Sequence, residues 1–192
     1  MKDHPEYQYL NLLREILDRG VKQVDKGTGA VTWSVFGRQI RFDLSQDFPL
    51  LTTKKVYWPG VLHELYWFLS GQSNIKYLVD NYVHLWDDYP YKLYREKALK
   101  GEVAEITKEE FIEKIKTDDE FAEKFGELKH IYGEMWRRWP ATDGRTVDQI
   151  RWVVSELKEE PDCHNALVTS WNPEFLYDMA KSDVEEAIKE EI

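Results

Sequence analysis

The sequence of 192 residues predicts a chain that mixes helices and strands, in an α+β or an α/β arrangement. Three observations support this prediction. Segments of about 10–15 residues place apolar side chains at helical spacing, and shorter segments between them alternate apolar and polar positions. The composition agrees, because 42% apolar and 14% aromatic residues suffice to bury a sizeable core.

The N-terminal part is predicted to begin with a helix and to continue into strands. Residues 6–19 carry three leucines on one helical face, and Gly20 is a natural stop. Apolar residues then alternate with polar ones over 31–35 and again over 40–44. Because Gly37 lies between these two runs, we expect a bent strand or a hairpin there.

Two helices are expected in the middle of the chain. Pro59 suits the first turn of a helix that runs to Ser70, with Gly71 just beyond its end. Asn74 is expected to cap a shorter helix that continues through Val79.

Two later helices and one strand follow from capping residues and an apolar run. Thr107 and Glu110 form a predicted capping box before an amphipathic helix. Thr146 is expected to cap another helix, which extends to Leu157. The apolar run over 166–171 predicts a short strand.

The formal net charge of −10 is concentrated in two stretches. Residues 96–127 carry a net charge of −5 and residues 181–192 carry −3. Both stretches are expected to be solvated helices, the first as an exposed insertion and the second as an acidic tail. An acidic chain is a poor candidate for binding duplex nucleic acid, which requires clustered lysine and arginine.

The single cysteine, Cys163, excludes an intramolecular disulfide. No apolar run approaches the roughly 20 residues needed to span a bilayer, and the N-terminus lacks a signal-peptide pattern. We therefore expect a cytoplasmic protein with no membrane partner.

Glu64 is the candidate for acid–base chemistry, because it is surrounded in sequence by large apolar residues. A carboxyl group that is desolvated can become a general acid or base near neutral pH. Periodicity alone favours the alternative that Glu64 lies on the wet face of its helix. No pair of histidine or cysteine has metal-ligand spacing, so no metal site is expected.

Two further features could bind a ligand. The glycine-bearing loop at Lys26 could hold a phosphate through its N–H groups and one cation, although a plain turn is the better explanation of the loop by itself. Aromatic clusters over 86–89 and 131–139 suit a planar heterocycle, although tryptophans at this density also fill protein cores.

From about His4 to Ala180 the sequence resembles the N-terminal part of the folate-dependent thymidylate synthase family. The resemblance rests on ordered motifs, namely His4-Pro5-Glu6-Tyr7-Gln8-Tyr9-Leu10, Ser34-Val35-Phe36-Gly37, Phe42-Asp43-Leu44, Phe48-Pro49-Leu50-Leu51-Thr52-Thr53-Lys54-Lys55, His63-Glu64-Leu65, Trp67-Phe68-Leu69, Leu85-Trp86-Asp87, Tyr132-Gly133, Asp148-Gln149-Ile150 and Ser170-Trp171-Asn172-Pro173. We therefore expect one incomplete domain over 1–180, with a helical insertion over 96–127 and an acidic tail over 181–192.

The resemblance implies an α+β fold with a mixed sheet and packed helices, and an obligate homodimer. It implies conversion of dUMP to dTMP, with methylenetetrahydrofolate as the source of the carbon unit and the reducing equivalents. Glu64 would relay protons, Trp86 and Tyr132 would lie at the pyrimidine, and Trp86, Tyr89 and Lys54 at the folate.

The sequence departs from the family at positions that bind phosphate. Lys26 stands where the family has an arginine, and a lysine lacks the bidentate fork. His164 and Asn165 replace the paired arginines that family members lend across the dimer. Losing charge-assisted contacts of about 1.5–3 kcal/mol each should weaken nucleotide binding strongly. Tyr89 replaces the second tryptophan of its motif.

Cys163 is not expected to be the family's nucleophile, because it precedes Trp171 by eight residues, where the family has a serine. The nucleophile should follow shortly after Ala180, so we expect a chain that ends before it, lacks the C-terminal strands and is inactive alone. Two alternatives remain open: a non-catalytic paralogue that pairs with a full-length synthase, and a pyrimidine nucleotide hydroxymethylase.

Overall fold

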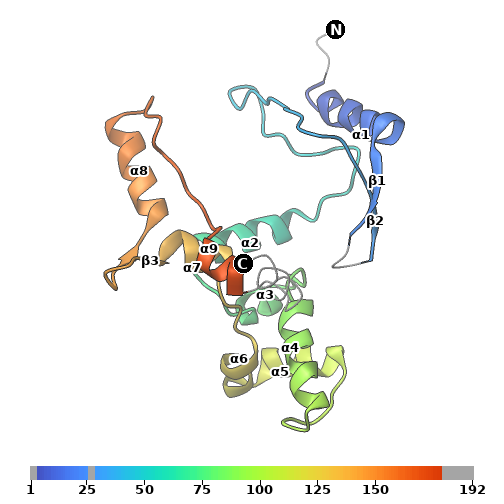
Figure 1. The fold of residues 1–192 in the computed structure, drawn as a ribbon, viewed down its shortest axis with the longest axis vertical. Coiled ribbons are helices and arrows are strands. Elements are labelled where there is room, and N and C mark those ends of the chain that lie inside the picture. The colour runs from blue at the N-terminus through green and yellow to red at the C-terminus, as the bar shows by residue number, and fades with distance from the viewer. Residues whose placement is uncertain (1–3, 26–28, 179–192) are drawn as a thin grey trace, which may run out of the picture. The chain divides into compact units, whose positions relative to one another are not determined.

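The computed structural model describes residues 4–25 and 29–178. The chain divides into two compact units, Met1–Tyr57 and Trp58–Ile192 (Figure 1). Helices dominate and the strands are short, which confirms a mixed α and β protein. No helix among the described residues is long and apolar enough to cross a membrane. The acidic tail over 181–192 lies outside the described residues.

The first unit contains one helix and one antiparallel pair of strands. Helix α1 (Tyr7–Arg19) ends at Gly20, whose N–H donates to the Ile16 carbonyl, as the sequence predicts. Strands β1 (Val21–Val24) and β2 (Val31–Ser34) then pair, with Val21 opposite Ser34. Both strands are exposed along their whole length.

Glu6 anchors the start of α1 to the end of this unit. Its buried carboxylate accepts hydrogen bonds from the N–H and hydroxyl groups of both Thr52 and Thr53. These four donors, chiefly the two hydroxyls, lower the pKa of Glu6 to about 2.

The predicted strand over 40–44 is wrong. Gly37 bends the chain with φ of +45°, and the segment beyond it forms no ladder among the described residues. The main chain of Arg41 bonds instead to the side chain of Gln8 on α1. A side-chain amide therefore satisfies peptide groups that a neighbouring strand would otherwise satisfy.

The second unit begins with α2 (Trp58–Leu69) and α3 (Lys76–Asp80), close to the predicted ranges. Gly71 ends the first of these helices with φ of +71°, a conformation that favours glycine. The Asn74 side chain accepts the Lys76 N–H at the start of the second helix. Asn74 therefore acts as the cap, although the N-cap position itself is Ile75.

Three helices of this unit surround a core of aromatic and aliphatic side chains. They are α4 (Asp88–Leu99), α5 (Lys108–Thr117) and α6 (Asp119–Phe125), which lie side by side in Figure 1. Phe111 and Ile115 are fully buried here, and the rings of Tyr94 and Phe121 contact Phe111. The predicted capping box at Thr107 and Glu110 is present.

The acidic stretch over 96–127 is therefore more than an exposed insertion. Its charged residues face solvent, but its apolar stripe forms much of the core, with Phe111, Ile115 and Ala122 almost inaccessible. Because an amphipathic helix must bury its apolar face, the stretch packs against α3 and α4.

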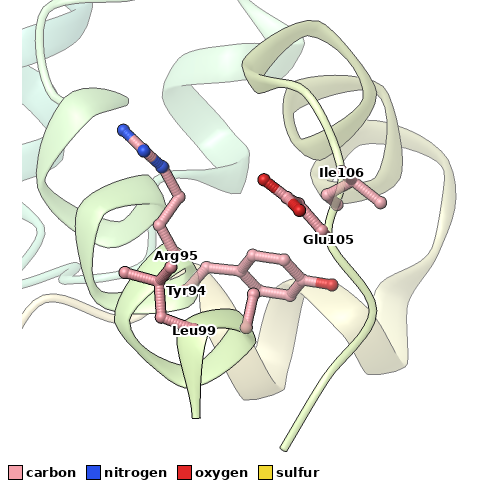
Figure 2. Close-up of a pocket in the computed structure, with 6 residues that line it drawn as sticks. Tyr94, Arg95, Leu99, Glu105 and Ile106 are labelled. Atoms are coloured by element: carbon pink, nitrogen blue, oxygen red, sulfur yellow. The ribbon is translucent and has the colours of Figure 1, made fainter. Parts of the chain in front are cut away.

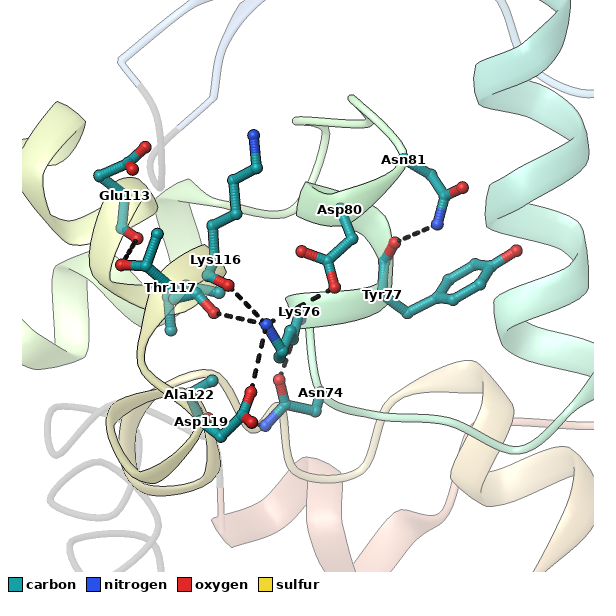
Figure 3. A network of polar contacts seen from close by, with 11 residues as sticks. Asn74, Lys76, Tyr77, Asp80, Asn81, Glu113, Lys116, Thr117, Asp119 and Ala122 are labelled. Carbon is teal, nitrogen blue, oxygen red and sulfur yellow. Dashed lines mark hydrogen bonds and ion pairs between the residues drawn. The ribbon is translucent and has the colours of Figure 1, made fainter.

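Lys76 joins α3 to this group of helices (Figure 3). Its ammonium lies 2.6 Å from the carbonyl oxygen of Lys116 at the end of α5, and 3.4 Å and 3.6 Å from carboxylate oxygens of Asp119 and Asp80. A cation at a helix C-terminus stabilises the carbonyls that lack helical partners.

The rest of the unit consists of α7 (Tyr132–Arg137), the paired strands β3 (Trp139–Pro140) and β4 (Thr146–Val147), α8 (Gln149–Glu159) and α9 (Pro173–Asp178). The predicted cap at Thr146 is wrong, because this residue pairs in β4. Asp148 caps α8 instead, since its carboxylate accepts the Arg151 N–H.

The strand predicted over 166–171 and the expected mixed sheet are not formed among the described residues. The structure has two separate antiparallel pairs. Thr169 makes its main-chain hydrogen bonds with the Gln149 side chain rather than with a strand. The apolar run is therefore extended but has no ladder.

Candidate functional site

Glu64 lies on α2 and is held by Trp86. The Trp86 indole N–H donates to Oε1 of Glu64 at 2.7 Å, across 22 residues of sequence. Glu64 is half-buried, so the fully solvated alternative does not hold. Its neighbours Trp67 and Phe68 form the buried face of the same helix. The carboxylate therefore stands at the edge of an aromatic core, oriented by one donor.

Trp86 is the centre of the aromatic cluster around this carboxylate. Its ring centroid lies 5.9 Å from that of Phe68 and 6.2 Å from that of Tyr132, both in edge-to-face geometry. The ring centroid of Tyr89 lies 5.5 Å from that of Trp86. The structure thus brings together four predicted site residues, Glu64, Trp86, Tyr89 and Tyr132.

A cavity of about 330 Å³ opens beside Trp86. Aromatic side chains dominate its lining, and a few polar groups complete it. The lining residues are Trp86, Tyr89, Leu128, Lys129, His130, Ile131, Tyr132, Ser170, Trp171, Asn172 and Phe175. This combination of flat apolar walls and few polar groups is typical of small-molecule sites, whose volumes begin near about 300 Å³.

Gln149 positions the wall over 170–172. Its amide nitrogen donates to the carbonyls of Met135 and Thr169, both at 2.8 Å, and its oxygen accepts the Thr169 N–H at 3.0 Å. One buried amide thus ties α7, α8 and the extended segment together. Asn172 then accepts the Glu174 N–H and starts α9, which carries Phe175 into the cavity wall.

Gly133 sets how closely α7 approaches α2. A Cβ atom at this position would lie 2.7 Å from the Gln72 carbonyl oxygen and 3.0 Å from that of Phe68. Only glycine fits without movement of the main chain, so this residue sets the distance of the neighbouring Tyr132 from Phe68.

Asp87 is a buried residue beside this cluster that no sequence pattern marks as part of a site. Only 1% of its surface is exposed, and Oδ2 lies 2.7 Å from Nδ1 of His84. Its other oxygen has no hydrogen-bond partner among the described residues. Burial raises the pKa of Asp87, although the contact with His84 opposes this shift. The signal available in the sequence was a carboxylate directly after Trp86.

The other residues named from the sequence belong to other parts of the chain. Lys54 belongs to the first unit, where its side chain is exposed. Lys26 lies outside the described residues. Cys163 is half-buried, with His164 and Asn165 exposed beside it. No group of three or more potential metal ligands occurs within 4–25 and 29–178.

A smaller hollow lies between α4 and the segment over 104–106 (Figure 2). Its volume is about 30 Å³, so it could hold a water molecule but no substrate. The Tyr94 hydroxyl crosses it to donate to the Ala104 carbonyl at 2.8 Å. This feature stabilises the fold, and the cavity at Trp86 remains the candidate site.

Comparison with known proteins identifies the family. The family model for thymidylate synthase matches residues 7–183. The chain is 45% identical over 174 residues to a thymidylate synthase of Mycoplasma genitalium, covering 90% of this chain and 57% of that protein. It is 43% identical over 178 residues to one of Rhodopseudomonas palustris, covering 92% and 58%. It is 45% identical over 181 residues to one of Sinorhizobium fredii, covering 94% and 58%.

This chain therefore spans a little under three fifths of the length of these curated relatives. The matched range includes the four site residues Glu64, Trp86, Tyr89 and Tyr132, as well as Lys26 and Lys54. The chain belongs to the thymidylate synthase family.

Proposed function

We propose that this chain carries the glutamate side of a thymidylate synthase active site, which converts dUMP to dTMP with methylenetetrahydrofolate. The observation that supports this most directly is the hydrogen bond to Glu64 from Trp86, which itself lines the aromatic cavity. In this proposal Glu64 relays protons, and the indole N–H of Trp86 fixes the position of its carboxylate. Methylenetetrahydrofolate supplies the carbon unit and the reducing equivalents when bound.

The walls of the cavity suit the two ligands. Trp86 and Tyr132 offer ring edges and faces to the pyrimidine, and Trp86 and Tyr89 do so for the folate ring system. Lys54 is proposed at the folate edge and Lys26 at the phosphate.

We also propose that the 192 residues do not complete the reaction alone, because Cys163 is not the nucleophile. The two antiparallel strand pairs would be parts of the mixed sheet of the family, and residues 1–180 would be one incomplete domain.

We further propose that the chain forms a homodimer or a complex with a full-length synthase. It is supported by the exposed apolar residues of β1 and β2, namely Val21, Val24, Val31 and Trp33.

A chimera tests the catalytic proposal. Residues 1–180 are joined to the remaining part of the Mycoplasma genitalium relative, and dTMP formation is measured. We expect activity, and a loss of about 10²–10⁴-fold for Glu64→Gln. Glu159→Gln, on the exposed end of α8, is the matched control and should retain activity. A folded chimera without activity would count against the proposal.

The unmodified chain provides the second arm. Incubation with 5-fluoro-dUMP and methylenetetrahydrofolate, followed by intact mass measurement, should give no covalent adduct. An adduct on Cys163 would refute its exclusion as nucleophile.

A non-catalytic paralogue is the competing proposal, favoured by His164 and Asn165 in place of the paired arginines. It predicts an inactive chimera together with co-purification of the chain with a full-length synthase.

A further inference from the structure

The cavity at Trp86 differs in charge from the rest of the chain. The formal net charge is −10, yet no aspartate or glutamate is among the described residues that line this cavity. Apart from tyrosine phenols, its ionisable lining groups are Lys129 and His130, adjacent in sequence just before α7. An acidic protein thus has a site whose charged lining group is a cation beside an imidazole.

His130 is held in place by both its main chain and its ring. Its φ of +57° lies in the left-handed region, which few residues other than glycine adopt. The N–H donates to the Glu134 carboxylate at 2.8 Å, and this glutamate does not line the cavity. The imidazole stacks on Phe175 with centroids 3.7 Å apart and planes 21° apart.

These restraints make the imidazole part of a fixed wall. The stack joins the loop before α7 to α9, across 45 residues of sequence. A non-glycine residue held at positive φ costs free energy and is found preferentially at ligand-binding positions. The cavity therefore has aromatic faces on Trp86 and Trp171 and, on the Phe175 side, an imidazole next to a lysine.

We propose that Lys129 and His130 make this cavity selective for a planar heterocycle that carries an attached anion, with His130 as a specificity-determining residue. The proposal rests on the proposed function, since it places the ligand in the same cavity. The aromatic faces bind the heterocycle, and the lysine and imidazole donate to its phosphate or carboxylate. The anion can come from a nucleotide or from a folate, and the two sources are separable by experiment.

The test compares charged and neutral probes on the full chain. Equilibrium binding is measured for dUMP against deoxyuridine, and for folic acid against 6-hydroxymethylpterin. The variants are Lys129→Gln and His130→Asn, since asparagine tolerates a left-handed main chain. Lys158→Gln, at the exposed end of α8, is the control for loss of one positive charge.

We expect each cavity variant to reduce the preference for the charged probe by about twofold to fivefold, corresponding to a partly exposed ion pair. Neutral-probe affinity should be unchanged, the effect should weaken at high salt, and Lys158→Gln should have no effect. Loss confined to dUMP assigns the anion to the nucleotide, and loss confined to folic acid assigns it to the folate.

Three outcomes overturn the proposal. Unchanged preference in either cavity variant removes the role of the pair. Equal loss of charged and neutral binding in His130→Asn shows that the residue only supports the wall. No binding of any probe to the wild-type chain contradicts the cavity as a ligand site, whereas the proposed function is contradicted separately, by a folded chimera without activity.

Discussion

Replacing Gln149 by leucine should destabilise the second unit and loosen the cavity wall. The substitution removes three hydrogen bonds, to the Met135 carbonyl and to both peptide groups of Thr169. At about 1 kcal/mol for each bond, the free energy of unfolding should fall by about 3 kcal/mol. This is a large part of the roughly 5–15 kcal/mol that holds a typical domain folded.

Urea unfolding followed by circular dichroism measures this loss, and an unchanged slope would show that the extent of unfolding is the same. Gln72→Leu is the matched control, because its amide makes one exposed bond, to the Ser70 hydroxyl. Its effect should stay within about 0.5 kcal/mol. A loss below about 1 kcal/mol for Gln149→Leu would refute the reasoning that this buried amide holds the wall.

Four further substitutions test other parts of the structure. The folded state lowers the pKa of Glu6 and favours its charged form, so the wild type should lose stability as the pH falls from about 4.5 towards about 2. Glu6→Gln should abolish this loss. Asp87→Asn should gain stability relative to the wild type as the pH rises from about 3.8, because burial raises the pKa of Asp87 and disfavours its charged form; parallel denaturation curves from pH 2 to 8 check both. Gly133→Ala should cost about 1–3 kcal/mol in urea unfolding, because its Cβ would meet the Gln72 carbonyl. Phe111→Ala should cost about 3–5 kcal/mol in the same assay, since it empties a fully buried aromatic position.

Helix ends were the most predictable part of the fold, because their signals are local. The Thr107 hydroxyl accepts the N–H of Glu110 and the Glu110 carboxylate accepts the N–H of Thr107, so the predicted capping box is formed within four residues. Gly20 and Gly71 likewise end their helices where expected. Helix α4 was not predicted, because only contacts with distant helices give Tyr94 its buried position.

Strand prediction failed where a side chain replaced a ladder. The segment over 166–171 has the composition of a strand, but its peptide groups at Thr169 are satisfied by Gln149, 20 residues earlier. The alternation over 40–44 is equally clear in sequence, yet Arg41 pairs with the side chain of Gln8. Alternation of apolar and polar residues indicates which face of a segment can be buried, but it does not identify the group that will bond to the segment's peptide groups.

The candidate site was predictable in its residues but not in its contacts. The sequence identified Glu64 because a carboxylate among large apolar residues costs free energy to bury, and the family resemblance selected Trp86 and Tyr132. Neither could show that Trp86 donates to Glu64 or that His130 stacks on Phe175. Those pairs are separated by 22 and 45 residues, and they form only once the helices between them have packed.

A shared principle explains how the cavity keeps its shape with so little regular secondary structure around it. Each wall is fixed by one polar side chain: the Glu64 carboxylate holds Trp86, the Gln149 amide holds Thr169 just before the segment over 170–172, and the Glu134 carboxylate holds His130. Two of these acceptors lie on helices, and the amide lies at the first residue of one. Because a side-chain anchor fixes one point rather than a whole strand, the segments between anchors can differ in sequence while the aromatic faces stay in place. Substitutions at the anchors should therefore change ligand binding by moving a wall, whereas Lys129 can change ligand preference without altering the fold.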